Sequence, residues 1–81
     1  MTPLSRSHAA FGDAIRELRK ERGIAQEGLA LKSGLNRGYY GDVESGERNV
    51  SLANILKIAK ALEVPASVIH ARAEQLLADR G

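Results

Sequence analysis

Few side chains of this 81-residue sequence have the types and spacing that catalysis or metal binding requires. Cysteine is absent, and the two histidines, His8 and His70, lie near opposite ends of the chain. His70 and Glu74 are one helical turn apart and could share a metal ion. Two ligands make a poor site, however, and a solvated helix face explains the pair better. No glycine-rich phosphate loop is present, so we expect no enzyme, no metal site and no cofactor.

Length and composition limit the chain to one small domain built on an apolar core. Hydrophobic residues make up 43% and charged residues 27% of the sequence, the balance of a soluble globular protein. No apolar run approaches the roughly 18 residues of a membrane helix, and no signal peptide is visible, so we expect a cytoplasmic protein. The net charge is only +2, with seven bases and four acids in residues 1–40. This asymmetry is compatible with a nucleic-acid face in that half, although ordinary surface composition often produces it.

Apolar spacing predicts five helices and no strand, which defines a compact all-α domain. Residues 1–7 are polar and are expected to form a flexible arm, whereas residues 8–81 are expected to form the single domain. Glycines at positions 23, 34 and 46 end the first three helices, and a break at residues 63–65 ends the fourth. The predicted helices span residues 8–22, 26–33, 36–45, 52–62 and 65–79.

The two short helices within Gln26–Gly46 carry the most functional information. A tight turn at Gly34 supplies the positive φ that lets the chain reverse, so the two helices must cross at a steep angle. Ala30 is small enough for that crossing, and Tyr40 and Val43 are expected to face inward. This spacing is typical of a helix-turn-helix whose second helix is exposed on its outer face. From spacing alone, an ordinary helical corner in a bundle is the alternative.

Four motifs follow one another along the chain at linked spacing. They are F-G-x-x-I-R-x-L-R-x-x-x-G (Phe11–Gly23), Q-E-x-L-A (Gln26–Ala30), E-x-G-x-R-N (Glu44–Asn49) and S-L-x-x-I-x-x-I-A-x-A-L-x-V (Ser51–Val64). Together they resemble the Cro/C1-type, or Xre-like, DNA-binding domain of phage repressors, over about residues 11–70. The resemblance implies the five-helix lambda-repressor-like fold. A chain this short most resembles the controller proteins of restriction–modification systems.

The resemblance implies DNA contacts on and around the second short helix. Gln26 would hydrogen-bond a phosphate. Arg37 could present a bidentate fork to guanine O6 and N7, or simply pair with a phosphate. Asp42 could accept a hydrogen bond from a cytosine or orient one of the nearby arginines, and Ser51 could contact a phosphate or cap the next helix. The implied DNA-binding residues are Gln26, Asn36, Arg37, Gly38, Tyr39, Asp42, Arg48, Asn49 and Ser51.

Other positions imply a structural role or depart from the family pattern. Glu44 and Arg19 match an ion pair that the family buries beneath the recognition helix. Ala25 stands where a capping Ser or Thr is usual. Gly38 and Gly41 replace side chains in the recognition helix and lower its helix propensity. The base preference of relatives therefore does not transfer to this chain.

The fifth predicted helix is expected to form a homodimer interface. The apolar residues along it, and at the end of the fourth helix, exceed what a small four-helix core can cover. A two-fold dimer would present two recognition helices to a palindromic operator. The expected interface consists of Val64, Val68, Ile69, Ala73, Leu76 and Leu77.

The implied function is that of a sequence-specific transcriptional regulator, which binds double-stranded DNA in the nucleoid of a prokaryote or phage-infected cell. RNA polymerase is a further candidate partner. One alternative is an antitoxin, which would bind both DNA and a protein toxin and is expected to carry a partner-binding tail. Another is a protein-interaction domain that has lost DNA binding, although Gln26, Arg37 and Arg48 disfavour it.

Overall fold

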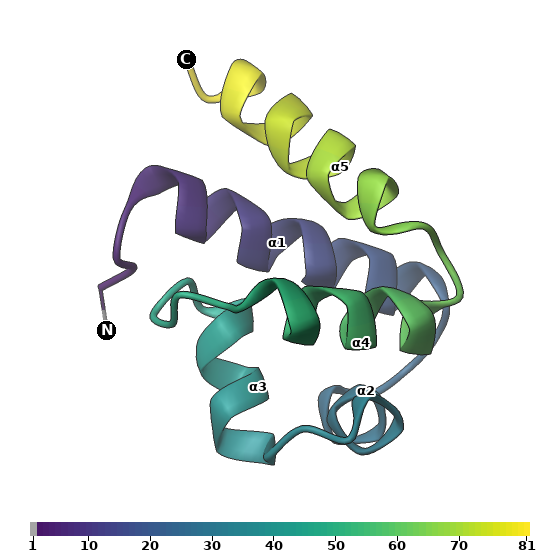
Figure 1. Ribbon diagram of the computed structural model, residues 1–81. Helices are drawn as coiled ribbons and strands as arrows, with labels where there is room; N and C mark the ends of the chain where they lie inside the picture. The colour runs from purple at the N-terminus through teal and green to yellow at the C-terminus, as the bar shows by residue number, and fades with distance from the viewer. Residues whose placement is uncertain (1) are drawn as a thin grey trace.

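The computed structural model describes residues 2–81, which form five α-helices and, within that range, no strand (Figure 1). The helices are α1 (Arg6–Glu21), α2 (Gln26–Ser33), α3 (Arg37–Glu44), α4 (Leu52–Leu62) and α5 (Ala66–Asp79). Helix α1 packs against α5 and α3, while α2 packs against α4 and α3. The all-α fold predicted from the sequence is confirmed. No helix in residues 2–81 is long and apolar enough to cross a membrane.

Left-handed residues end the helices at the predicted places. Gly23, Gly34 and Gly46 have φ angles of 66°, 70° and 77°, a conformation that glycine adopts without a steric penalty. Helix α4 ends differently, because Glu63 takes a φ of 60° although it has a side chain. Local chain chemistry therefore sets most helix boundaries.

The segment before α1 is shorter than the sequence predicts. We expected residues 1–7 to precede the first helix, but α1 begins at Arg6. The cause is Ser5, whose hydroxyl accepts a hydrogen bond from the backbone N–H of His8 at 3.1 Å and so caps the helix. The backbone N–H of Leu4 also donates to the carbonyl of Gly46 at 2.8 Å. Met1, the first residue of the predicted arm, lies outside the described residues.

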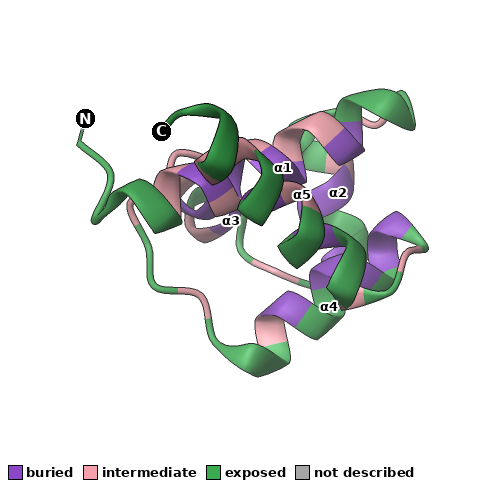
Figure 2. Cartoon of the chain, turned by 90° about the horizontal axis from the view of Figure 1, so that it is seen from above, coloured by how far each residue is buried: buried purple, intermediate pink, exposed green. Residues whose placement is uncertain are grey.

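The core is formed by the inner faces of all five helices, while the outer side of α5 is exposed (Figure 2). Its largest fully buried apolar side chains are Tyr40, Ile15, Leu29, Ile58, Leu62 and Ile69. Two leucines of α4 lie outside the core, although apolar spacing predicts that they belong to the buried stripe of this helix. Leu52 and Leu56 are 71% and 52% exposed, because they occupy the flank of α4 rather than the face that the other helices cover.

Helix α5 completes the core of its own chain, which corrects part of the expected dimer interface. Ile69 is fully buried and Ala73 is 6% exposed, so these two residues pack within the chain and not against a second subunit. Helix α1 leaves an apolar flank that the other three helices do not cover, and α5 fills it. Arg72 of α5 reinforces this packing, with ion pairs to Glu17 at 3.0 Å and to Glu21 at 2.7 Å on α1.

Candidate nucleic-acid interface

Helices α2 and α3 cross steeply through a tight turn, and α3 is left exposed on its outer side (Figure 1). The backbone N–H of Leu35 donates to the carbonyl of Ala30 at 3.0 Å across the turn. Ala30 is 2% exposed, and Tyr40 and Val43 on the inner side of α3 are buried. This is the helix-turn-helix geometry expected from the sequence, with an outward face on α3 that begins at Arg37.

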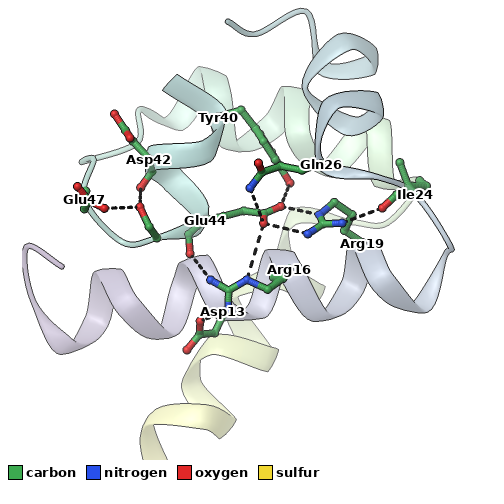
Figure 3. A network of polar contacts seen from close by, with 10 residues as sticks. Asp13, Arg16, Arg19, Ile24, Gln26, Tyr40, Asp42, Glu44 and Glu47 are labelled. Carbon is green, nitrogen blue, oxygen red and sulfur yellow. Dashed lines mark hydrogen bonds and ion pairs between the residues drawn. The ribbon is translucent and has the colours of Figure 1, made fainter. Parts of the chain in front are cut away.

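A buried carboxylate links α3 to α1 and α2 (Figure 3). Glu44 accepts two hydrogen bonds from Arg19, from Nε to Oε2 at 2.7 Å and from Nη2 to Oε1 at 3.1 Å. The hydroxyl of Tyr40 donates to the same carboxylate at 2.5 Å, and Nε2 of Gln26 donates to it at 3.2 Å. The structure therefore contains the Arg19–Glu44 ion pair that the sequence predicts, within a larger network.

The network keeps Glu44 ionised and Tyr40 neutral. Burial acts to raise the pKa of the Glu44 carboxyl, but hydrogen bonds from Arg19, Tyr40 and Gln26 outweigh burial and hold that pKa below its usual value. The hydrogen bond to Glu44 raises the pKa of Arg19. Burial, together with the hydrogen bond to the carboxylate, raises the pKa of the Tyr40 phenol. An ionised pair with a neutral phenol is therefore the resting state beneath α3.

Helix α1 crosses the end of α3 at close range because residue 12 is glycine. A Cβ atom at Gly12 would lie 2.3 Å from the carbonyl oxygen of Glu44 and 2.6 Å from that of Val43. The close approach lets Nη2 of Arg16 donate to the Glu44 carbonyl at 2.9 Å, which satisfies a carbonyl at the helix end. Sequence reasoning gave neither Gly12 nor Arg16 a role, although both belong to the first motif.

The start of α2 combines a held amide with an uncapped helix end. Gln26 is the first residue of α2, is exposed, and keeps its amide beside α3 through the hydrogen bond to Glu44. Ala25 occupies the capping position, and no side chain there accepts a hydrogen bond from the first turn. Backbone N–H groups at such a helix start suit an anionic oxygen.

The first residues of α3 have distinct roles. Asn36 is the N-cap, since its Oδ1 accepts a hydrogen bond from the backbone N–H of Tyr39 at 3.0 Å. A Cβ atom at Gly38 would lie 3.2 Å from that same oxygen, so the glycine leaves space for the cap. Arg37 points outward, and its Nη2 lies 2.5 Å from Oε1 of Glu27 on α2. The sequence did not single out Glu27.

Tyr39 is half-buried and held on two sides. Its hydroxyl accepts a hydrogen bond from Nδ2 of Asn54 at 3.0 Å, and the guanidinium carbon of Arg48 lies 5.3 Å from its ring centroid. Arg48 in turn pairs with Asp42, with 3.1 Å between Nη2 and Oδ2. Asp42 therefore orients Arg48, which is one of the nearby arginines. Asn54 was missed, because only the fold brings α4 beside α3.

The loop after α3 contacts the start of α1. Oδ1 of Asn49 lies 3.0 Å from Nε2 of His8, so this histidine supports the loop, a role the sequence did not suggest. The hydroxyl of Ser51 accepts a hydrogen bond from the backbone N–H of Asn54 at 3.1 Å. Ser51 therefore caps α4, one of the two roles considered for it.

A comparison with protein families decides the relationship. The profile described as helix-turn-helix matches residues 15–69, from the middle of α1 into α5. The chain belongs to this helix-turn-helix family. Within it, the protein is a Cro/C1-type regulator, as its sequence motifs indicate.

The relatives of this helix-turn-helix protein include control proteins. It is 39% identical to control protein C.MunI of a Mycoplasma species over 66 residues, which are 80% of this chain and 89% of the relative. It is 49% identical to control protein C.BamHI of Bacillus amyloliquefaciens over 55 residues, which are 67% and 68% of the two chains.

A solved structure gives the same relationship. The restriction-modification controller protein C.AhdI of Aeromonas hydrophila matches with a TM-score of 0.74 and 52% identity, over 75% of this chain and 92% of that one. The protein is thus a helix-turn-helix DNA-binding regulator that is similar to restriction-modification controllers. This similarity favours a controller over the antitoxin alternative. Its curated relatives are control proteins and helix-turn-helix transcriptional regulators.

Proposed function

We propose that the protein is a controller of restriction–modification genes that binds a palindromic DNA operator as a homodimer and acts by binding alone. The observation that carries this proposal is the outward face of α3, which begins with an exposed arginine and rests on a buried ion-pair network. The network fixes the angle of α3 against α1 and α2, so its outer side chains enter a major groove in one register. Similarity to control proteins supports the proposal that the regulated genes are restriction–modification genes.

Within this function, side chains divide into those that read bases and those that grip the backbone. Arg37 at the start of α3 reads a guanine, while Tyr39 and Asp42 flank it on the groove side. Gln26 at the start of α2, and Arg48 and Asn49 in the loop after α3, contact phosphates, which fix the register and carry no base identity. Asn36, Gly38 and Ser51 contribute by shaping the ends of α3 and α4, with Asn49 beside them in the loop.

The dimer uses the apolar residues that the core leaves accessible. Val68 is 36% exposed, and Leu77 is half-buried. Val64 and Leu76 pack against the core with part of their surface open. Two copies related by a two-fold axis would place their recognition helices about one DNA turn, roughly 34 Å, apart. Sedimentation of a monomer at tens of micromolar, free and on DNA, would contradict this arrangement.

The test of DNA recognition begins with selection of duplexes from a random-sequence pool by the wild-type protein. Arg37→Ala is expected to lose about 1–3 kcal/mol per half-site on the selected duplex and to relax the preference at one base position. Gln26→Ala is expected to weaken all duplexes by the same factor. A uniform loss in Arg37→Ala would make Arg37 a phosphate contact, and failure of the wild type to enrich any sequence would refute the proposed function.

The dimer is proposed to act in the cytoplasm, on the DNA of the nucleoid, and its effect on transcription depends on where its operator lies relative to a promoter. We propose RNA polymerase as its partner at a promoter that overlaps the operator. In vitro transcription from a template carrying the selected duplex upstream of a promoter tests this. A transcript level that changes with wild-type protein, and not with Arg37→Ala, is the expected result.

A further inference from the structure

The two arginines on the proposed DNA-binding surface are held by carboxylates of the same surface. Nη2 of Arg37 lies 2.5 Å from Oε1 of Glu27, and the two side chains are 70% and 63% exposed. Nη2 of Arg48 lies 3.1 Å from Oδ2 of Asp42, and these side chains are 50% and 37% exposed. Each of the two guanidinium groups therefore has a carboxylate partner on the protein surface in the absence of DNA.

Glu27 does more than its place in α2 requires. An acidic residue in the first turn stabilises a helix through the helix dipole, and Glu27 occupies that turn. Its carboxylate nevertheless forms an ion pair with the guanidinium of Arg37, which is the first residue of the recognition helix α3. Next to Gln26, a proposed phosphate contact, an acidic side chain also repels the DNA backbone. Such a residue lowers affinity for DNA in general. How much it lowers the affinity for a given sequence depends on whether Arg37 finds a stronger contact on that DNA than its ion pair with Glu27.

The strengths of the competing contacts show what is exchanged. An exposed ion pair is worth a factor of up to about five in an equilibrium constant. A bidentate contact to a guanine edge discriminates by roughly 5- to 150-fold against other bases. A phosphate met at random therefore gives Arg37 little advantage over Glu27. A guanine in register gives it a clear one.

We propose that Glu27 is a specificity-determining residue that acts through Arg37, by keeping the guanidinium on the protein unless a guanine displaces the carboxylate. The inference rests on the proposed DNA-binding function. On non-operator DNA, Arg37 stays paired and neutralises no phosphate. On the operator, Arg37 leaves Glu27 for the base. Glu27 thus weakens binding to the wrong sequences more than binding to the right one.

The experiment compares the wild type with Glu27→Gln on two probes: the duplex selected by the wild type and a random-sequence duplex of equal length. Glu27→Gln is expected to raise affinity for the random duplex more than for the selected one. The ratio of the two affinities should fall by up to about fivefold per subunit. The log–log salt slope on random DNA should steepen by about 0.9 per subunit, because the released arginine neutralises one more phosphate.

Two matched variants separate this coupling from a general change in charge. Glu21→Gln removes the same charge from an exposed carboxylate that pairs with Arg72 on the α1–α5 side of the molecule, and should leave the affinity ratio unchanged. In an Arg37→Ala background, Glu27→Gln should change both affinities by the same factor. Thermal unfolding of each variant checks folding, and Glu27→Ala should repeat the result.

The outcomes are distinguishable. An unchanged affinity ratio in a folded Glu27→Gln protein overturns the role of Glu27 and leaves DNA binding standing. A ratio that falls equally in the Arg37→Ala background also overturns it, because the effect would not pass through Arg37. If the wild type selects no sequence, the proposed function and this inference both fail.

Discussion

Arg19 of α1 and Glu44 of α3 lie 25 residues apart and form two parallel hydrogen bonds in the interior of the protein. Their side chains are 11% and 2% exposed. A buried ion pair adds little net stability, because desolvation of both charges offsets their attraction. It does fix orientation, since Arg19 meets Glu44 in one geometry only. The pair therefore sets how α3 leans on α1.

Removal of the carboxylate should be far more damaging than the net value of the pair. Glu44→Ala is expected to lower the free energy of unfolding by about 3–5 kcal/mol, because the Arg19 guanidinium stays buried without its partner. Tyr40→Phe removes one donor to Glu44 and should cost about 1–2 kcal/mol. Urea denaturation measures both. Glu74→Ala on the exposed side of α5 is the control, and a Glu44→Ala loss no larger than that of the control would contradict the role of the pair.

Acid should weaken the protein through the same carboxyl group. The pKa of Glu44 is lower in the folded chain than in the unfolded one, so its stabilising effect is complete above the unfolded value of about 4.3. That effect is lost as the pH falls through the folded pKa. Urea midpoints measured from pH 6 to pH 3 should fall more steeply for the wild type than for Glu44→Gln. Parallel curves would show that Glu44 does not carry this dependence.

A single methyl group at the crossing of α1 and α3 should separate the two helices. Gly12→Ala is expected to destabilise the protein by more than about 3 kcal/mol, because the new Cβ meets backbone oxygens that cannot move aside. Gly28→Ala is the matched control, since its Cβ would meet only Cγ2 of Ile24, at 3.4 Å. That variant should gain about 0.5–1 kcal/mol from helix propensity. Similar effects at the two positions would refute the close approach.

Salt should weaken operator binding only moderately. The protein has a net charge of +2, and the backbone N–H groups at the start of α2 can meet phosphates without formal charge. With about two or three cations per subunit near the DNA, the log–log slope for a dimer should lie between roughly −3 and −6. Titration of the selected duplex across monovalent salt measures it. A slope near −10 would mean that further basic side chains, such as that of Lys32, also contact the DNA backbone. A slope near zero would mean that the protein does not bind phosphates.

The sequence by itself indicated the helix-turn-helix through its family motifs, and it determined the helices and most of their ends. These features depend on neighbours in the chain: apolar spacing, glycines that take a left-handed φ, and serine or asparagine caps such as Asn36 and Ser51. The first helix began earlier than predicted, because Ser5 is also a cap. The Arg19–Glu44 pair could be predicted from the sequence only because the family pattern includes it.

Only the tertiary structure decided which partner each side chain takes. Apolar spacing shows that a helix face is covered but not by what, so Ile69 was assigned to a second subunit when it is buried in the core of its own chain. In the same way, the sequence shows that a residue is charged but does not show which residue it pairs with. Asp42 takes Arg48 and Arg37 takes Glu27 because the fold brings α2, α3 and the following loop together. The reach of these contacts across separate elements is set by packing, which local sequence does not encode.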